Sequence, residues 1–262
     1  MSRAQARPQP KLQAQPRPRP QLRPPAERFD RLDALRGVAI VWMALFHFGF
    51  DLNHFGLLTP KQNFYSDPFW TVQRSCIVSL FLFCAGLGQA VALEAGQGWP
   101  RFWRRWAQIA GCALLVSIGS ALMFPRSWIS FGILHGMALM LIAARLLAPL
   151  RGGLWLVGVL FVALPQFVQH PFFDSRWTNW VGLVTRKPVA EDYAPVLPWL
   201  GVMCFGLAAG QWLLARHRGA LAGALAAPFA PLATLGRWSL AFYMVHQPVL
   251  IGAILAWRAI AA

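Results

Sequence analysis

Hydrophobic residues fall along most of the chain in long runs, separated by short segments in which charges and prolines gather. A helix that crosses the hydrocarbon core of a membrane needs about 20 mostly apolar residues, and runs of this kind differ from the amphipathic patterns of soluble helices and strands. We therefore predict an all-α, polytopic transmembrane helix bundle with about seven spans. The expected spans are residues 34–55, 73–93, 105–124, 129–148, 153–168, 197–215 and 239–259.

Two segments keep the number of spans open. The run 153–168 is short and contains Pro165 near its end, and the weaker run 220–235 is interrupted by Pro228 and Pro231. A short apolar segment broken by prolines is more typical of a re-entrant or surface segment than of a full crossing. Eight or nine spans therefore stay open beside the preferred seven.

Composition and charge agree with a membrane protein, since 57% of the residues are hydrophobic and 13% are charged. The net charge of +15 would suit nucleic acid, but the basic residues follow the predicted topology: 17 of the 24 Lys and Arg residues lie on the side of the N-terminus. This asymmetry is the positive-inside signature. It predicts a multi-pass protein of the inner (plasma) membrane, surrounded by lipid, with a cytoplasmic N-terminus and no nucleic-acid partner.

The chain divides into a tail, residues 1–27, and a membrane domain, residues 28–262. The tail is rich in Pro, Gln and Arg and has almost no residues that could form a core, so we expect it to be disordered, cytoplasmic and uncleaved. It would serve mainly as a solvated, topology-setting segment. Its basic charge could also attract anionic lipid at the cytoplasmic surface.

The four cysteines predict neither a disulfide framework nor a zinc site. All of them lie within expected spans, and no two have the paired spacing of metal-binding cysteines. We expect packing or lipid-facing roles for these thiols, which are Cys76, Cys84, Cys112 and Cys204.

The first span is the most informative, because it contains ionisable side chains in a segment apolar enough to cross a bilayer. Such groups are costly in lipid and are functional candidates. Arg36 and His47 are eleven positions apart, close to three helical turns, so they share a helix face with Asp51. The axial distance from Arg36 to His47 is about 16 Å, comparable with an extended phosphopantetheine arm. An imidazole oriented by a carboxylate is a common general base, so His47 and Asp51 are our candidate catalytic residues.

Further polar side chains lie in or at the ends of other spans. A single intramembrane histidine can simply hydrogen-bond a neighbouring helix, so we assign these residues to a second-rank pocket. They are Arg74 and Ser75 at the start of the second span, His135 in the fourth, and Arg237, Ser239, Tyr243 and His246 at the start of or within the last.

Two non-enzymatic classes also place histidines in membranes. A cytochrome b-like haem bundle needs two histidines per helix near opposite membrane faces, but His47 and His54 are only seven residues apart. A transporter usually shows internal repeats or matching broken helices, and we find no convincing repeat. A non-catalytic membrane transporter or binding protein stays open as the alternative to an enzyme, and a Soret band or solute uptake by vesicles would reveal these two classes.

A family resemblance begins with two segments of the first span, Arg31 to Ile40 and Leu45 to Leu52. They resemble the opening of the heparan-alpha-glucosaminide N-acetyltransferase catalytic-domain family, in its short bacterial branch. The separation of the Arg and the His by ten residues is shared by the wider transmembrane acyltransferase superfamily. The resemblance covers roughly Arg28 to Trp257, because four later landmarks are similar and follow in order: Ser79-Leu-Phe-Leu-Phe-Cys-Ala-Gly, Ser127-Trp-Ile-Ser-Phe-Gly-Ile-Leu-His, Pro198-Trp-Leu-Gly-Val and Leu235-Gly-Arg-Trp-Ser-Leu-Ala-Phe-Tyr-Met-Val-His-Gln-Pro-Val.

The resemblance implies that an acyl group, expected to be acetyl from acetyl-CoA, passes to an acceptor reached from the opposite side. Arg36 would bind a CoA phosphate through its planar guanidinium, with Arg104 and Arg105 as helpers. His47 would either remove a proton from the acceptor or carry the acetyl group itself, and the sequence does not choose between these routes. His135, Tyr243 and His246 would donate to the developing oxyanion or line the channel.

The acceptor is expected to be a sugar or a cell-envelope glycan, with N- and O-acylation both open. Animal members of the family act on a terminal glucosamine amine, but longer members carry extra spans that this chain lacks. The predicted outer loop, residues 170–195, could stack on a sugar, although interfacial Trp and Tyr occur in any membrane protein. We expect no metal. The loop residues in question are Asp174, Trp177, Trp180, Glu191, Asp192 and Tyr193.

Overall fold

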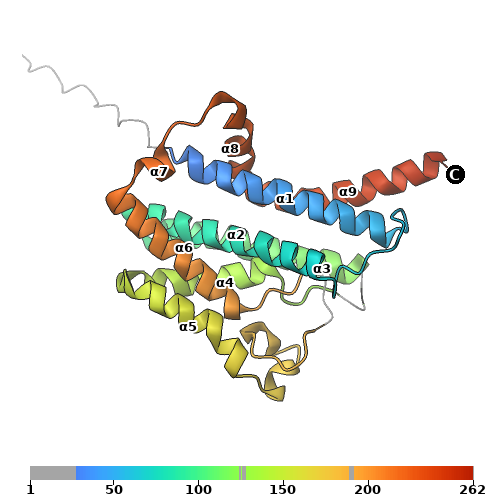
Figure 1. The fold of residues 1–262 in the computed structure, drawn as a ribbon, viewed down its shortest axis with the longest axis horizontal. Coiled ribbons are helices and arrows are strands. Elements are labelled where there is room, and N and C mark those ends of the chain that lie inside the picture. Colours follow the sequence, from blue (N-terminus) through green and yellow to red (C-terminus); the bar gives the residue numbers. More distant parts are fainter. Residues whose placement is uncertain (1–27, 124, 126–127, 189–191, 262) are drawn as a thin grey trace, which may run out of the picture.

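The computed structural model describes residues 28–123, 125, 128–188 and 192–261, so the tail, Arg126, Ser127 and Glu191 lie outside the described residues. Within the described ranges the chain is helical and forms no strand, which confirms the predicted all-α fold (Figure 1). Nine α-helices are described: α1 (Asp30–His54), α2 (Pro68–Glu94), α3 (Trp99–Met123), α4 (Ile133–Leu147), α5 (Gly153–Phe167), α6 (Val196–Arg216), α7 (Gly219–Ala222), α8 (Ala230–Arg237) and α9 (Ser239–Ala261).

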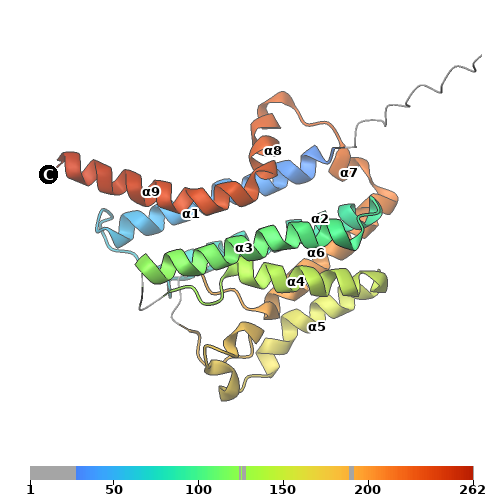
Figure 2. The same ribbon diagram turned by 180° about the vertical axis from the view of Figure 1, so that it is seen from behind.

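Each of the seven predicted spans coincides with one helix. In the described part of the chain, six of these helices are long and apolar enough to cross a membrane, namely α1, α2, α3, α4 with its short 3-10 extension, α6 and α9. The seventh, α5, has 15 residues and is shorter than a usual span. Figures 1 and 2 show these helices lying side by side and running alternately in opposite directions, as successive crossings would.

The weaker apolar run 220–235 does not form a long helix. It is divided into α7, a 3-10 turn and α8, and Pro228 and Pro231 lie at the first turns of the latter two elements. Proline is compatible with a first turn, where its missing N–H would have no helical partner. In Figure 2 the short helix α8 lies against the N-terminal half of α1.

The bundle is held by close helix contacts at small residues. On α2, a Cβ at Gly86 would lie 2.2 Å from the carbonyl oxygen of Met203 on α6, and on α1, one at Gly37 would lie 2.1 Å from the carbonyl oxygen of Leu232 on α8. Small residues allow such approach and are favoured between membrane helices, where lipid supplies little hydrophobic driving force for association. The α2–α6 pair forms the centre, and α1, α8 and α9 lie on one side of it.

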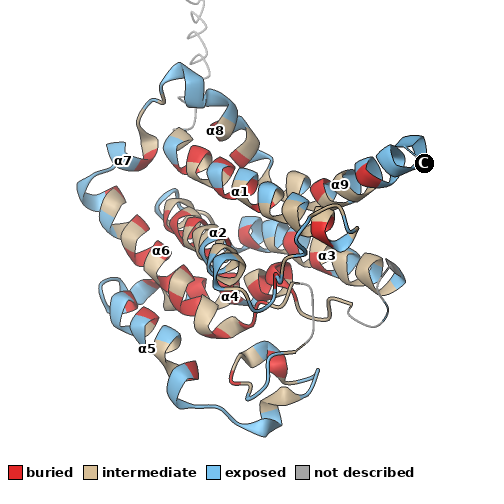
Figure 3. Ribbon diagram, turned by 45° about the vertical axis from the view of Figure 1, so that its right-hand side comes forward, coloured by how far each residue is buried: buried red, intermediate tan, exposed pale blue. Residues whose placement is uncertain are grey.

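The outer surface is apolar, as expected for helices in contact with lipid. Figure 3 shows buried residues concentrated where α2 and α6 meet, with exposed residues toward the outside. Large apolar side chains are exposed on α3 at Leu114, Leu115 and Ile118 and on α9 at Val245 and Val249. In water this would be an unfavourable surface, so the exposure pattern agrees with a multi-pass membrane protein.

Candidate functional site

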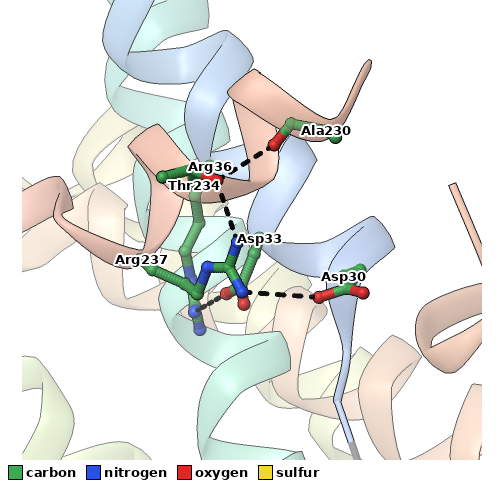
Figure 4. Close-up of polar contacts among 6 residues, drawn as sticks. All are labelled: Asp30, Asp33, Arg36, Ala230, Thr234 and Arg237. Atoms are coloured by element: carbon green, nitrogen blue, oxygen red, sulfur yellow. Dashed lines mark hydrogen bonds and ion pairs between the residues drawn. The ribbon is translucent and has the colours of Figure 1, made fainter. Parts of the chain in front are cut away.

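Charged side chains gather where the start of α1 meets α8 (Figure 4). Arg36 donates from Nη1 to Oδ1 of Asp33, one turn earlier, at 2.8 Å. Arg237 ends α8 and donates to the Thr234 hydroxyl at 2.9 Å, and its guanidinium lies 3.9 Å from Asp30. The two acidic residues lie in the first turn of α1, where carboxylates interact favourably with the helix dipole. They also hold the arginines at this end of the bundle.

A cavity of about 260 Å³ lies beside Arg36, between α1, α2, α3, α4 and the junction of α8 and α9. Three arginines from separate segments line it, Arg36, Arg105 and Arg237, and the described lining residues include no carboxylate. Asp33 and Asp30 pair with Arg36 and Arg237 from outside the lining, which leaves one positive charge in excess, and this excess favours anions. The remaining lining residues are mostly apolar or polar and uncharged: Phe81, Cys84, Ala85, Gly88, Gln89, Ala92, Gln97, Phe102, Trp106, Ile109, Met137, Leu141, Gly236 and Ser239.

Two residues of α2 affect how this cavity could hold a molecule. A Cβ at Gly88 would lie 2.4 Å from the Arg36 guanidinium, so the glycine makes room for that group. Gln89 is 9% exposed, and its Oε1 has no hydrogen-bond partner within the described structure. An unpaired buried acceptor is costly, and a donor from a ligand would remove that cost.

The predicted arginines separate into two groups. Arg104 and Arg105 are both exposed, but only Arg105 is among the residues that line the cavity. Arg237 and Ser239, assigned from the sequence to the second-rank pocket, lie at the Arg36 cavity. The structure therefore joins the start of the last span to the start of the first.

Around His47 the polar groups are bonded to one another. His47 Nδ1 lies 3.0 Å from Oε1 of Gln247 on α9, and Gln247 Nε2 donates to Oδ1 of Asp51 at 2.8 Å. Asp51 is 3% exposed. The expected pairing of Asp51 with His47 therefore runs through an amide side chain from another helix.

His246, the residue before Gln247, also meets His47. Their rings pack edge to face, with centroids 5.1 Å apart. Nδ1 of His246 lies 2.8 Å from the carbonyl oxygen of Tyr243, and its Nε2 is buried without a partner within the described structure. Two imidazoles therefore lie together about three turns along α1 from Arg36.

A third element reaches this region from the loop before α6. Oδ2 of Asp192 accepts from the Tyr243 hydroxyl at 2.8 Å and from the backbone N–H of Ile133 at 3.2 Å, so it joins α9, α4 and the loop. Burial raises the pKa of Asp192 to about 6, against the lowering effect of the Tyr243 and Ile133 hydrogen bonds and of the Arg74 charge. Desolvation disfavours the carboxylate form, which explains the direction.

The other second-rank residues lie near this end without joining the His47 cluster. His135 Nε2 lies 3.2 Å from the Ser117 hydroxyl on α3, and its Nδ1 accepts from the Gly132 N–H. Ser75 is exposed and donates within its own helix to the Thr71 carbonyl. Arg74 acts on Asp192 through its charge.

Sequence reasoning missed Gln247 and Gln89, and it placed Asp192 only in a sugar-binding loop. A polar residue directly after His246 in an apolar span was the available signal for Gln247. The contact of Asp192 with Tyr243 spans 51 positions and has no local signature. In the described part of the chain, no group of three or more His, Cys, Asp or Glu side chains could hold a metal ion.

Comparison with known proteins adds one match. A family model described as heparan-alpha-glucosaminide N-acetyltransferase, catalytic, matches residues 28–248, which include the Arg36 cavity and the His47 cluster. No curated protein and no solved structure matches the chain.

Proposed function

We propose that this chain, which belongs to the heparan-alpha-glucosaminide N-acetyltransferase catalytic family, transfers an acetyl group from acetyl-CoA to a sugar or cell-envelope glycan. The family is one of membrane acetyltransferases, and its match covers most of the chain. In our proposal the Arg36 end faces the cytoplasm of the inner membrane and the loop before α6 faces the acceptor. The excess of Lys and Arg on the N-terminal side supports this orientation.

The observation that carries the proposal is the position of two different environments along one helix face. Arg36 lies in a cavity lined by three arginines, and His47 lies eleven residues further along α1, about 16 Å at the rise of an α-helix. Guanidinium groups bind phosphate through paired charge-assisted hydrogen bonds. A phosphate held by Arg36, Arg105 and Arg237 would leave a long thioester arm able to reach His47.

The cavity also offers groups suited to the rest of such a donor. The unpaired Oε1 of Gln89 can accept from an amide N–H, and Phe81, Ile109 and Leu141 provide apolar surface. Arg104 would contribute only long-range attraction, because it lies outside the lining of the cavity.

His47 would act as the base. Its imidazole would take the proton of an acceptor hydroxyl or amine while that atom attacks the thioester carbonyl, which contributes about 10²–10⁴-fold to rate in comparable reactions. The second route, in which His47 itself is acetylated, uses the same residues. His246 is the second-rank residue best placed to line the reaction site, because it contacts the His47 ring directly.

The acceptor would approach from the loop before α6. Trp177 and Trp180 are exposed there, and Asp192 ties this segment to Tyr243 three residues before His246. Exposed aromatics can stack on sugar rings, and the hydroxyl of Tyr243 is already engaged by Asp192. Asp174, His135, Arg74 and Ser75 would then support this side of the site without touching the reacting atoms.

The test is acceptor-dependent release of free CoA by the detergent-solubilised protein, with acetyl-CoA and a panel of amino sugars and envelope glycans. His47→Ala should lower the rate at least 100-fold, whereas His54→Ala, an exposed histidine on the same helix, should not change it. Equal rates for the native chain and His47→Ala would remove His47 from the mechanism. No release with any acceptor or acyl donor, together with solute uptake by vesicles, would favour a transporter instead.

A second measurement separates the two chemical routes. A single turnover with radiolabelled acetyl-CoA and no acceptor should leave label on the protein if His47 carries the acetyl group, and His47→Ala should lose that label. Absence of label in the native chain under the same conditions would support direct transfer.

A further inference from the structure

We propose that Gln247 is a positioning residue, which holds the His47 imidazole with its proton on Nδ1 and its Nε2 free. The Asp51 carboxyl group orients the Gln247 amide, and through the amide it orients the His47 ring. This inference rests on the proposed role of His47. It assigns to an uncharged residue of α9 the task that the sequence alone gave to a direct contact between His47 and Asp51.

The orientation of the Gln247 amide follows from its two partners. Its Nε2 lies 2.8 Å from Oδ1 of Asp51, and its Oε1 lies 3.0 Å from Nδ1 of His47. An amide nitrogen only donates and an amide oxygen only accepts. With Asp51 ionised, the opposite orientation would bring two acceptor oxygens together, so the carboxylate determines which end of the amide faces His47.

The amide in turn determines the tautomer of His47. Because Oε1 of Gln247 cannot donate, the hydrogen bond exists only when Nδ1 of His47 carries the proton. In a neutral imidazole Nε2 is then the bare nitrogen. The ring thus presents its proton-accepting atom away from Gln247, and the neutral amide places no formal charge against it.

Among the described residues, Gln247 is the side chain that forms a hydrogen bond with Asp51. It is 3% exposed, its Oδ1 accepts from Gln247, and its Oδ2 is buried without a hydrogen-bond partner within the described structure. A buried carboxyl group with one bond is costly to keep. Its bond to Gln247 is therefore the contact through which it can affect His47.

His246 shows the same tautomer by an independent contact. Its Nδ1 lies 2.8 Å from the Tyr243 carbonyl oxygen, which only accepts, so Nδ1 carries the proton and the buried Nε2 is bare. His246 and Gln247 are consecutive on α9 and both contact His47. The last helix thus supplies one residue that orients the base and one bare nitrogen beside it.

The proton balance uses only these atoms. Nε2 of His47 takes the proton of the acceptor O–H or N–H as the acceptor atom forms its bond to the thioester carbonyl carbon. When the carbon–sulfur bond breaks, the same Nε2–H returns the proton to the leaving sulfur. Throughout, Nδ1–H stays bonded to Oε1 of Gln247, which prevents the ring from turning or changing tautomer.

The test compares Gln247→Leu and Gln247→Glu with Gln73→Leu in the full chain. Gln73 is a matched control, because it accepts a hydrogen bond from Trp42 and so also joins α1 to a neighbouring helix. Gln247→Leu should lower kcat about 10–100-fold, by analogy with partners that orient metal-binding histidines, without changing KM for acetyl-CoA. Gln247→Glu should keep more activity than Gln247→Leu, because its carboxyl group shares one proton with Asp51 and still accepts from Nδ1 of His47. It should also move the acidic limb of the rate–pH profile to higher pH, because the negative charge of this pair then lies against the imidazole.

A ¹⁵N spectrum of histidine-labelled protein reads the tautomer without turnover. His47, assigned with His47→Ala, should show a protonated Nδ1 and a bare Nε2 in the native chain and in Gln73→Leu, and a mixed signal in Gln247→Leu. An unchanged tautomer in Gln247→Leu, or a kcat and pH profile equal to those of Gln73→Leu, would overturn the inference. Absence of turnover in the native chain would instead refute the proposed function. The ¹⁵N spectrum would still show whether Gln247 determines the tautomer of His47.

Discussion

Around Arg36 the structure leaves space among positive side chains, whereas around His47 it fills the space with polar groups bonded to one another. The first region is a cavity of about 260 Å³ whose described lining includes three arginines and no carboxylate. The second joins His47, Gln247 and Asp51 in one chain of hydrogen bonds. The difference is the one expected between a site that must attract and release a charged molecule and a site that must hold one reactive group in one geometry.

The comparison predicts different kinetic signatures for the two regions. Changes at the Arg36 end should act mainly on KM for acetyl-CoA, and changes at the His47 end mainly on kcat, because only the latter group interacts with the reacting atoms. A set of variants that failed to separate in this way would show that the two regions are not a binding end and a chemical end.

The largest effect should come from breaking the contact that builds the Arg36 end. A Cβ at Gly236 of α8 would lie 1.8 Å from the backbone carbonyl oxygen of Asp33, so Gly236→Ala must push α8 away from α1. We expect a loss of about 3 kcal/mol or more in stability, at the upper end for overpacking, measured by thermal unfolding in detergent. Gly111→Ala, at a glycine with open space around it, is the control and should not destabilise the protein. Equal melting temperatures for the two variants would contradict the close contact.

The second largest effect should come from removing Arg36. Arg36→Ala deletes a guanidinium that lines the cavity, and a hydrogen bond to a charged group contributes about 1.5–3 kcal/mol. We therefore expect KM for acetyl-CoA to rise about tenfold to 100-fold, with a smaller change in kcat. Arg36→Lys should recover only part of the loss, because lysine lacks the planar fork. A variant that lost kcat and kept KM would assign Arg36 to chemistry.

A smaller effect should separate the neighbouring arginines of α3. Arg105 lines the cavity and Arg104 does not, so Arg105→Ala should raise KM about tenfold, the size of one charge-assisted hydrogen bond. Arg104→Ala should change KM less than Arg105→Ala, and the exposed Arg101 provides a further control. Equal losses for positions 104 and 105 would show that long-range attraction, and not contact within the cavity, is what matters.

An effect confined to a narrow pH range should appear at Asp192, as a dependence of stability on pH. Burial raises its pKa to about 6 in the folded protein. The folded state therefore binds its proton more tightly than the unfolded state, and stability falls as pH rises from about 4 to 6. Asp192→Asn keeps an acceptor oxygen for Tyr243 and removes the titration, so it should lack this fall. A difference of about 2–4 °C in melting temperature corresponds to 1 kcal/mol; parallel pH curves for the two proteins would refute the assignment.

Particular residues show which features of the site could be predicted from the sequence. Arg36, His47 and Asp51 share a face because helical geometry depends only on spacing, and the structure keeps all three on α1. Arg237 and Ser239 were assigned only to a second-rank pocket, and the structure places them in the lining of the Arg36 cavity. That position depends on α8 packing against α1, which no local pattern encodes.

By itself, the sequence determined the helical class, the approximate spans, the charge asymmetry and the polar face of the first helix. These properties follow from local composition and from the period of the α-helix, so a single chain suffices to infer them. Only the tertiary structure decided which helices meet. It placed Gln247 between His47 and Asp51, brought Asp192 to Tyr243, and admitted Arg105 but not Arg104 to the cavity. Contacts between distant segments depend on close packing between helices, and hydropathy along the chain does not indicate which helices pack together.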